Sequence, residues 1–441
     1  MASGSSAAIA AGSLLTEMIK GRHWRRAAAL SATSLMERLG PARSGTLLKS
    51  INVSSSFAIE ALHRALGDSI RQGTFPVAGG IREEAVLVAM SGGVDSSAAC
   101  LLEKQAGGDV IGVTMRLWSE PGEGAGAARG CCSLEAVLDA RETCHRLGLP
   151  HLTVDFSDAF LKEVVDDFSR HYLEGRTPNP CVRCNGRLRF PALLKLAGRL
   201  GAARVATGHY ARIVRKDGRP LLARGADPGK DQSYMLWGIG PEHLKKLSFP
   251  LGEMRKPRVR ALARNARLPA SGRPESQDIC FIPDGDYRRF IRSRAKAGRA
   301  ALPGRGDIVD INGNKIGTHG GYHDYTVGQR RGLGGGARDA LYVIKTVPEQ
   351  NLVVAGHRDE LAVRSIEISD VNSFAAVEEG QQLLLQMRYN SPAEPARVSP
   401  GARIWKADLK KPGYGVAPGQ SAVFYKSEVV VAGGVISATL S

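Results

Sequence analysis

The sequence predicts an α/β protein with a mostly parallel sheet and a smaller, all-β part at its C-terminal end. From residue 85 onward, short apolar runs alternate with segments of helical pattern. This alternation is typical of a parallel sheet covered by helices on both faces. After about residue 350 the pattern changes to β-rich segments, which favours a small β-barrel.

Four short apolar runs are the expected strands of the parallel sheet: Ala85–Met90, Val110–Met115, Leu152–Phe156 and Arg204–Thr207. Helices are expected between them, in a segment that continues through Leu102 and over residues 134–147, 158–173 and 189–200. Gly148 and Pro150 end the second of these helices, because neither residue continues a helix readily.

The strands expected near the C-terminus include Gln382–Met387, Ser421–Tyr425 and Glu428–Val431. Gly433-Gly434 is expected to interrupt the last of these strands. Two basic segments precede this region: a helix over Arg255–Arg267 and a flexible loop over residues 329–338. Both are suited to phosphate contacts, although a solvated charged face explains any single arginine equally well.

The composition excludes several classes of protein. With 43% hydrophobic and 23% charged residues the chain is neither disordered nor collagen-like, and no run approaches the roughly 18 apolar residues of a membrane span. Its 60 Lys and Arg against 43 Asp and Glu give a net charge of +17, which favours a polyanionic partner, nucleic acid first and acidic lipid second. The 7 cysteines are odd in number and clustered, which disfavours a secreted disulfide framework.

Residues 1–80 are rich in Ala, Ser, Leu and Arg and poor in acidic residues. This composition predicts a cleaved organellar transit peptide, for a mitochondrion or a plastid, followed by a poorly ordered linker. Without this leader the chain still carries a charge of about +12, so the argument for a polyanionic partner does not depend on it.

A Gly/Ser-rich turn, Ser91-Gly92-Gly93-Val94-Asp95-Ser96-Ser97, follows the first expected strand and opens the first helix. Such a turn directs backbone N–H groups and a helix N-terminus at one point, where an anion is stabilised. It matches neither the Walker loop nor the dinucleotide fingerprint. It resembles the signature of the PP-loop ATP pyrophosphatases, which split ATP between its α- and β-phosphates, usually to adenylate a carbonyl oxygen.

Two cysteine motifs lie further along the chain. Cys181 and Cys184 form a Cys-x-x-Cys pair in a Pro-rich loop, which is compatible with a zinc site, a redox pair or a working thiol. Nearby arginines, among them Arg183, favour the thiolate and therefore the working thiol. Cys280 lies between Ile and Phe, as a packed cysteine does, but the polar run before it indicates a loop.

Six further motifs follow in order: Ala206–Tyr210, Lys230–Tyr234, Phe249–Glu253, Ser276–Phe281, Tyr325–Arg330 and Pro418–Tyr425. Together with the Gly/Ser turn and the Cys-x-x-Cys pair, they resemble the tRNA-specific 2-thiouridylases (the MnmA/TrmU family) across roughly residues 84–438. The resemblance implies a PP-loop catalytic domain over 81–254, with residues 270–285 packed back on it. It further implies a central tRNA-binding domain over 255–355 and a C-terminal β-barrel over 356–441.

The implied activity is the ATP-dependent replacement of O2 of the wobble uridine of tRNA by sulfur, through adenylation of that oxygen and sulfur transfer from a cysteine persulfide. ATP is expected with Mg²⁺ that screens its phosphates and not with a metal site of the protein. The nucleotide-binding residues implied are Ala89, Met90, Ser91, Gly92, Gly93, Val94, Asp95, Ser96, Met115 and Gly208.

The resemblance makes Cys184 the nucleophile and Cys280 the persulfide carrier. The two thiols are then expected to meet and to finish as a disulfide that needs reduction. Whether the sulfur attacks directly or leaves first as sulfide stays open. The residues implied in tRNA binding are Asn179, Pro180, Cys181, His209, Lys230, Asp231, Gln232, Arg388, Tyr389 and Gln420. The implied partners are tRNAs that read Lys, Glu and Gln codons and a cysteine desulfurase or sulfur-relay protein.

The chain departs from the family pattern at several places. Many members have Asp at the position of Cys181, so the way in which Cys184 is activated stays open. Arg116-Leu117-Trp118 replaces a Lys-Asn-Trp sequence and precedes a Gly-rich insert, residues 122–130, and Cys131 and Cys132 are expected to serve packing. Three alternatives remain: another PP-loop adenylating ligase or sulfurtransferase with a different substrate, a tRNA-binding protein without catalysis, and a metal-binding structural module.

Overall fold

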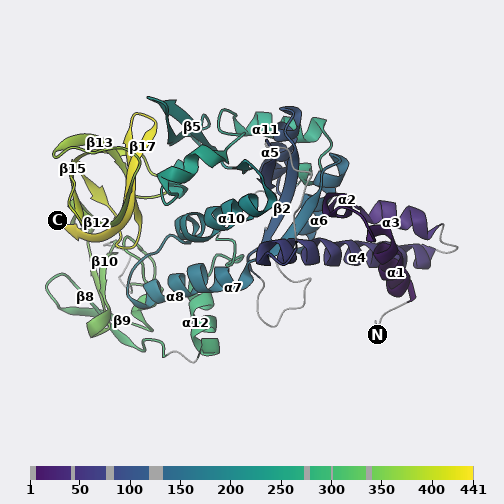
Figure 1. Cartoon of the computed structure of the whole chain (residues 1–441). Coiled ribbons are helices and arrows are strands. Elements are labelled where there is room, and N and C mark those ends of the chain that lie inside the picture. Colours follow the sequence, from purple (N-terminus) through teal and green to yellow (C-terminus); the bar gives the residue numbers. More distant parts are fainter. Residues whose placement is uncertain are drawn as a thin grey trace. The chain divides into compact units, whose positions relative to one another are not determined.

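The computed structural model describes residues 6–40, 45–75, 84–118, 133–272, 279–298, 301–333 and 340–440 (Figure 1). The chain divides into two compact units. Unit 1 comprises Met1–Ala159, Pro191–Tyr210 and Lys246–Phe281, and unit 2 comprises Phe160–Phe190, Ala211–Lys245 and Ile282–Ser441. Residues 160–190 and 211–245, which were expected in the catalytic domain, thus group with the C-terminal part of the chain.

A five-stranded parallel sheet forms the centre of unit 1, as the alternation of strands and helices predicts. Its strands lie in the order β3-β2-β1-β4-β7. Their bounds are β1 Val86–Ala89, β2 Val110–Arg116, β3 His151–Asp155, β4 Arg204–Ala206 and β7 Leu247–Ser248. Helices α5 (Val94–Gln105) and α6 (Leu134–Arg146) place Cys100, Ala140 and Cys144 against apolar side chains of β1 and β2. These residues form a continuous, water-excluded core.

The first 72 residues contain four helices: α1 (Ser6–Ile19), α2 (Trp24–Ala28), α3 (Ala32–Leu39) and α4 (Gly45–Gln72). They bury a core of their own that includes Ala11, Leu15, Leu35 and Ile59. The described part of this segment is therefore folded, which differs from the poorly ordered linker expected at its end. A low content of acidic residues does not prevent folding here, because small and apolar residues at helical spacing supply the packing.

Helix α4 lies along β3, the edge strand of the parallel sheet (Figure 1). The contact is close at Gly67, where an added Cβ would lie 2.2 Å from the carbonyl oxygen of Thr153. Asp68 accepts a hydrogen bond from the backbone N–H of Asp155, at 3.0 Å. The helix thus covers a strand edge that would otherwise present unpaired backbone groups.

Unit 2 contains a closed barrel of six antiparallel strands in the order β12-β15-β14-β13-β16-β17, closed by pairing of β12 with β17. The strands are β12 Ala362–Ser373, β13 Gln381–Gln386, β14 Glu394–Ser399, β15 Trp405–Tyr414, β16 Ser421–Lys426 and β17 Val429–Leu440. Closure removes the free strand edges of an open sheet. The predicted C-terminal β-barrel is therefore confirmed.

Strand β17 runs through Gly433 and Gly434, so the predicted interruption at these residues is wrong. A Cβ at Gly433 would lie 2.5 Å from the ring of Trp237. The glycine is needed for this close approach and does not end the strand.

The remaining elements of unit 2 are smaller. The hairpin β5 (Ala211–Lys216) and β6 (Arg219–Arg224) extends the barrel sheet from β17, and a separate four-stranded sheet has the order β10-β11-β8-β9. Its strands are β8 Gly306–Val309, β9 Lys315–His319, β10 Tyr342–Val347 and β11 Leu352–Gly356. Helices α7 (Ser157–Phe160) and α8 (Asp166–Leu173), joined by a π-helical turn, fill the predicted segment 158–173, which begins in unit 1.

Four further helices are described: α9 (Pro180–Arg183), α10 (Phe190–Leu200), α11 (Lys256–Asn265) and α12 (Tyr287–Gly298). Helix α11 confirms the helix predicted after Arg255, with Pro257 in its first turn, where proline is favoured. No helix among the described residues has the length and apolar character that crossing a membrane requires.

Candidate nucleotide and thiol sites

The Gly/Ser turn lies at the carboxyl ends of the parallel strands of unit 1. It follows β1, which pairs with β2 on one side and β4 on the other. Ala89 ends β1 and Met90 follows it, Met115 lies near the end of β2, and Gly208 follows β4 by two residues. The strand order changes direction at β1, which is where open α/β sheets bind ligands.

Hydrogen bonds within the turn fix its shape. The Ser96 hydroxyl accepts from the backbone N–H of Ser91 at 3.1 Å and donates to the carbonyl of Gly93 at 3.1 Å. Gly92 has φ +72°, and an added Cβ would lie 2.1 Å from the carbonyl oxygen of Ala136. Only glycine fits there, on both conformational and steric grounds.

The carboxylate of Asp95 binds two residues from later segments of the chain. Lys256 Nζ lies 2.7 Å from Asp95 Oδ1 and 2.8 Å from Oδ2, and the Tyr210 hydroxyl donates to Oδ1 at 2.9 Å. Only 9% of the Lys256 side chain is exposed. Sequence interpretation missed this role, since it assigned Lys256 to a basic surface helix and no local signal links residues 161 positions apart.

Gly208 and His209 complete the group of site residues near the turn. A Cβ at Gly208 would lie 2.7 Å from the backbone carbon of Asp95, so this glycine lets the chain after β4 approach the start of α5. The Thr207 hydroxyl and His209 Nδ1 lie 2.7 Å apart. His209, expected to contact tRNA, thus lies in unit 1, next to Gly208.

Cys280 also belongs to unit 1, and its side chain is partly exposed. The next residue, Phe281, is buried and packs edge-on against Trp118, with ring centroids 6.1 Å apart. Trp118 follows β2 by two residues, so this contact ties the Cys280 segment to the strand end that carries Met115. Ser276, Gln277 and Asp278 of the motif lie outside the described residues.

The segment that carries Cys184 lies in unit 2, where the barrel holds it. The backbone N–H of Thr177 donates to the carbonyl of Pro418 at 2.8 Å, and Gln420 Nε2 donates to the Thr177 carbonyl at 2.9 Å. Gln420, expected to touch tRNA, thus anchors the thiol segment through its side-chain amide.

Cys184 itself is 6% exposed and begins a π-helical turn, Cys184–Arg189, between the one-turn helix α9 (Pro180–Arg183) and α10. Asn179 caps α9 by accepting from the backbone N–H of Val182 at 3.2 Å. Asn185 Nδ2 donates to the carbonyl of Met235 at 3.1 Å. Irregular helical turns of this kind are frequent at functional sites.

The electrostatic surroundings of Cys181 differ from the expectation. Its side chain reaches solvent, but the surrounding protein disfavours the thiolate and, with the neighbouring Cys184, raises the pKa of Cys181 to about 11. Arg189 opposes this rise. Arg183, expected to favour the thiolate, instead donates to the carbonyl of Glu163 and lies 3.6 Å from Asp167.

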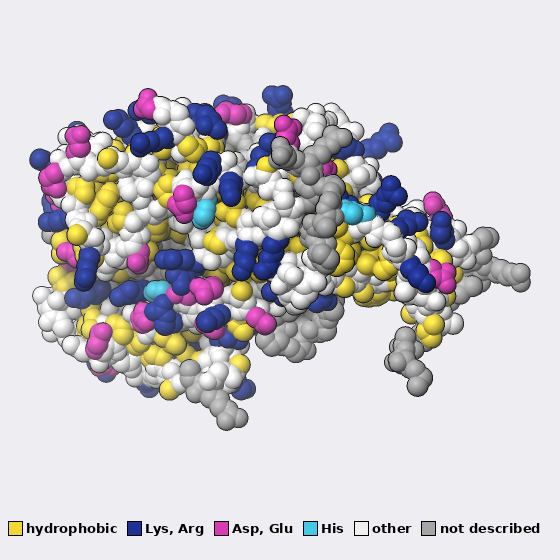
Figure 2. All heavy atoms as spheres, in the orientation of Figure 1, with side chains coloured by type: hydrophobic (Ala, Val, Ile, Leu, Met, Phe, Trp, Pro, Cys, Tyr) yellow, Lys and Arg dark blue, Asp and Glu magenta, His cyan; other side chains and the backbone are white. Residues whose placement is uncertain are grey.

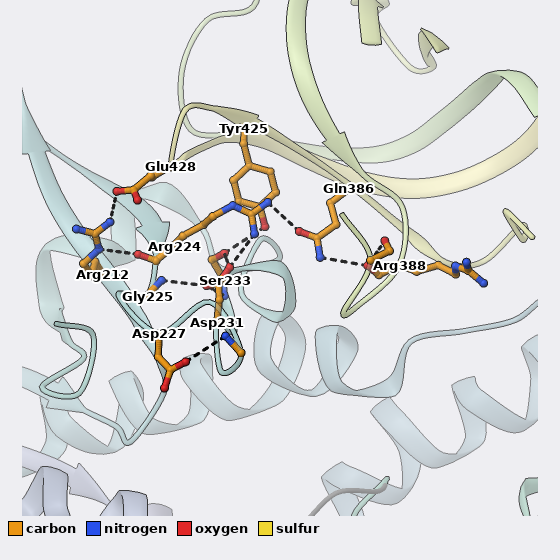
Figure 3. A network of polar contacts seen from close by, with 12 residues as sticks. Arg212, Arg224, Gly225, Asp227, Asp231, Ser233, Gln386, Arg388, Tyr425 and Glu428 are labelled. Atoms are coloured by element: carbon orange, nitrogen blue, oxygen red, sulfur yellow. Dashed lines mark hydrogen bonds and ion pairs between the residues drawn. The ribbon is translucent and has the colours of Figure 1, made fainter. Parts of the chain in front are cut away.

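The remaining residues expected to bind tRNA surround the same segment. Arg388 and Tyr389 are exposed at the end of β13. Burial and the charge of Asp231 raise the pKa of Tyr389, and Lys230 lowers it. Lys230, Asp231 and Gln232 lie in the loop after β6. Figure 3 shows Asp231 of this loop near Tyr425 and Gln386 of the barrel. Unit 2 therefore brings together Cys181, Cys184 and most of the predicted tRNA-binding residues.

Cys184 belongs to unit 2 and Cys280 to unit 1, and none of the five described cysteines forms a disulfide. Cys131, Cys132 and the insert 122–130 lie outside the described residues. Within the described part of the chain, no three His, Cys, Asp or Glu side chains are grouped to hold a metal ion.

Basic side chains are widespread on the surface. Figure 2 shows Lys and Arg side chains over much of the drawn face, interspersed with acidic ones. Of the predicted basic loop, Gln329–Leu333 is described, and residues 334–339 lie outside the described part. Within it, Gln329 Nε2 donates to the Arg331 carbonyl at 2.8 Å, and Arg330 and Arg331 are exposed.

Family models match four successive parts of the chain. Residues 84–284 match the tRNA methyl transferase HUP domain, 299–357 the tRNA methyl transferase PRC-barrel domain, and 363–436 the aminomethyltransferase beta-barrel domain. Residues 1–71 match the NifU-like N terminal domain. The N-terminal helices are therefore similar to a known protein domain.

Curated relatives are similar over most of the chain. The bifunctional protein NifU/MnmA of Rubrobacter xylanophilus is 44% identical over 444 residues, which cover 98% of this chain and 87% of that protein. The tRNA-specific 2-thiouridylase MnmA of Carboxydothermus hydrogenoformans is 44% identical and covers 82% of this chain and 99% of its own. The protein of the same name from Chloroflexus aggregans is 45% identical, with coverage of 80% and 98%.

Proposed function

Because this chain belongs to the MnmA family of tRNA-specific 2-thiouridylases, we propose that it replaces O2 of the wobble uridine of tRNA with sulfur in an ATP-dependent reaction. The observation that carries the proposal is the position of Cys184 in unit 2. The segment around this thiol is hydrogen bonded to the Gln420 loop and to Met235, close to the family's tRNA motifs.

In the first step the turn after β1 binds ATP. Its backbone N–H groups and the start of α5 stabilise the phosphates, and Gly92 and Gly208 let the backbone come close. Lys256 and Tyr210 neutralise and orient Asp95, so that this carboxylate does not repel the phosphates. Uracil O2 then attacks the α-phosphorus, pyrophosphate leaves, and O2 becomes part of an AMP leaving group.

Mg²⁺ bound with the nucleotide would screen the charge of its phosphates. The Ser91 and Ser96 hydroxyls, which lie 3.1 Å apart, are side-chain oxygens of the turn that would be available to the nucleotide and its cation.

In the second step sulfur replaces the activated oxygen. The terminal sulfur of a Cys280 persulfide reaches C2 of the uracil, either directly or as sulfide released when the Cys184 thiolate attacks the inner sulfur, and AMP leaves. In the direct route the Cys184 thiolate then attacks Cys280 Sγ in the Cys280–S–S–C2 adduct and releases the 2-thiouridine. Both routes therefore end with a Cys184–Cys280 disulfide, which an external dithiol reduces. Both routes require the thiol of unit 2 and the thiol of unit 1 to meet.

The partners follow from this chemistry. We propose that a cysteine desulfurase or sulfur-relay protein loads Cys280, and that the substrates are tRNAs that read Lys, Glu and Gln codons. Another PP-loop ligase with a small substrate is not favoured, because the curated relatives over most of this chain are tRNA-specific 2-thiouridylases.

Mass spectrometry of tRNA incubated with the protein, ATP, Mg²⁺ and a persulfide donor tests this function. We expect 2-thiouridine at the wobble position with the unaltered chain and loss of at least about 100-fold with Cys184→Ser or Cys280→Ser, because each removes a sulfur that the transfer requires. ATP–pyrophosphate exchange should persist in Cys280→Ser, since adenylation precedes sulfur transfer. Full thiolation by either variant would overturn the proposal.

A further inference from the structure

Asp231 lies in the motif that the family resemblance assigns to tRNA contact, yet its carboxylate is occupied within the protein. Oδ1 accepts the backbone N–H groups of Gly225 and Ser233, both at 3.0 Å. Oδ2 accepts from the Arg224 guanidinium at 2.9 Å and from the Ser233 hydroxyl at 3.0 Å. A carboxylate has about four acceptor positions, so these bonds use its capacity.

The exposure of Asp231 agrees with this internal role. Only 7% of its side chain is exposed. Its charge is opposite to that of Arg224 and of the same sign as a nucleic-acid phosphate, so an approach by the tRNA backbone would be repelled. Asp231 therefore faces the protein and not a polyanionic partner.

Arg224 connects Asp231 to the barrel (Figure 3). Its guanidinium carbon lies 3.7 Å from the centroid of the Tyr425 ring on β16, and it donates to Gln386 Oε1 on β13 at 2.9 Å. Gln386 Nε2 donates in turn to the carbonyl of Arg388 at 3.1 Å. The loop carboxylate is thus linked to the backbone of a residue expected to bind tRNA.

The other end of the loop reaches the thiol segment. The Ser233 and Tyr425 hydroxyls lie 3.1 Å apart, and the Tyr234 hydroxyl donates to the carbonyl of Ser421 at 3.0 Å. Met235, which follows, accepts the Asn185 amide through its carbonyl. Asn185 is bonded to Cys184 along the backbone. Hydrogen bonds and short stretches of backbone thus connect Arg388, through Asp231, to the residue next to the nucleophile.

We propose that Asp231 is a positioning residue that holds the loop 225–235 between the barrel and the Cys184 segment, and that it does not contact tRNA. The expected changes in kcat and KM rest on the proposed function, whereas the expected hydrogen exchange depends only on the network of bonds. Lys230 and Gln232, its neighbours in the loop, are presented to tRNA by the carboxylate between them.

The test compares Asp231→Asn with Asp217→Asn in the full-length protein. In Asp231→Asn an NH₂ group replaces one of the two acceptor oxygens. In one orientation of the amide this NH₂ group meets Arg224 and the Ser233 hydroxyl, and in the other it meets the two backbone N–H groups, so it faces donors in both. Asp217 is exposed at the β5–β6 turn with φ +49°, which asparagine tolerates, so its variant makes the same change in net charge without touching the network.

Three measurements separate positioning from contact. In Asp231→Asn we expect at least about tenfold faster hydrogen exchange at the Gly225 and Ser233 amides, because both lose their acceptor or gain a competing donor. We expect kcat for 2-thiouridine formation to fall about tenfold or more while KM for tRNA changes less than about threefold. The slope of log Kd against log salt should match that of the unaltered chain, whereas Lys230→Ala should reduce it by about 1.

An increase in KM for tRNA with kcat unchanged, or a reduced salt slope, would show that Asp231 contacts tRNA and would overturn the inference. So would unchanged exchange at Gly225 and Ser233. A midpoint of thermal unfolding close to that of Asp217→Asn controls for general loss of structure. If the unaltered chain forms no 2-thiouridine, the proposed function fails, while the exchange measurement still decides whether the network exists.

Discussion

At the scale of single residues, two side chains have roles that differ from those their neighbours in the sequence indicate. Lys256 begins a basic helix, but its side chain is buried and pairs with Asp95 of the Gly/Ser turn. Arg183 stands beside the thiols in the sequence but pairs with acidic residues of the preceding helical segment. In both cases tertiary packing, and not proximity in the sequence, determines which acidic residue pairs with the basic side chain.

Cys181 offers a prediction at this scale. Because its pKa is raised to about 11, its thiol is neutral at pH 7–9, and a neutral thiol neither attacks nor accepts a proton efficiently. We expect Cys181→Ser to keep 2-thiouridine formation within about threefold of the unaltered chain. Alkylation of Cys181 by iodoacetamide, followed by peptide mass spectrometry, should be slow at pH 8 and should rise steadily toward pH 11. A loss comparable to that of Cys184→Ser would assign Cys181 a chemical role.

At the scale of elements, the N-terminal helices are attached to the catalytic sheet through α4. Besides the Gly67 contact, Glu60 of α4 faces the Arg141 guanidinium at 3.7 Å, with both side chains largely buried. Arg141 also donates to the carbonyl of Ser56 at 3.2 Å. Removal of these helices would therefore expose a strand edge and leave Arg141 without its acceptors.

Gly67→Ala tests this attachment. The new methyl group would meet the Thr153 carbonyl at 2.2 Å, so α4 must move away from β3, and we expect a loss of about 1–3 kcal/mol in the free energy of unfolding. Gly12→Ala in α1 is the matched control, because nothing lies within 4 Å of its added Cβ. It should stabilise the protein by about 0.5–1 kcal/mol through helix propensity. Urea denaturation of both variants gives the comparison, and equal stabilities would contradict the docking described here.

At the scale of the whole molecule, buried histidines make stability depend on pH. His63, His145 and His151 lie together between α4, α6 and β3, with ring centroids 5.5 and 5.6 Å apart for the two pairs that include His63. Burial lowers the pKa of all three, that of His145 to about 4, and the nearby Arg141 adds to this effect. Glu60 has a raised pKa because of its burial and acts in the opposite direction.

The sign follows from the protons bound by each state. Between pH 6.5 and 4 the unfolded chain protonates these histidines and the folded chain does not, so the free energy of unfolding falls as the pH decreases. The contribution of His145 reaches at most about 3 kcal/mol. Urea denaturation at pH 7.5 and 5.0 should show this loss, and His145→Gln should reduce it. His243→Gln, at a histidine whose side chain is 39% exposed, is the control. A pH dependence unaffected by His145→Gln would contradict this assignment.

The net charge of +17 is also a property of the whole chain and supports a salt-dependent affinity for tRNA. Transport to a mitochondrion or plastid stays a prediction from the composition of residues 1–80. Any cleavage near residue 80 would remove α4 from β3.

The sequence by itself determined the alternation of strands and helices and the barrel near the C-terminus, and it predicts the Gly/Ser turn as a phosphate site and Cys184 and Cys280 as working thiols. These features are local: a strand, a turn or a motif is set by residues within about a dozen positions. Only the tertiary structure decided that Lys256 pairs with Asp95, that Arg224 and Ser233 enclose Asp231, and that α4 packs against β3 of the sheet. Each depends on contacts between segments far apart in the chain, where the free energy comes from burial and charge pairing that no local pattern encodes.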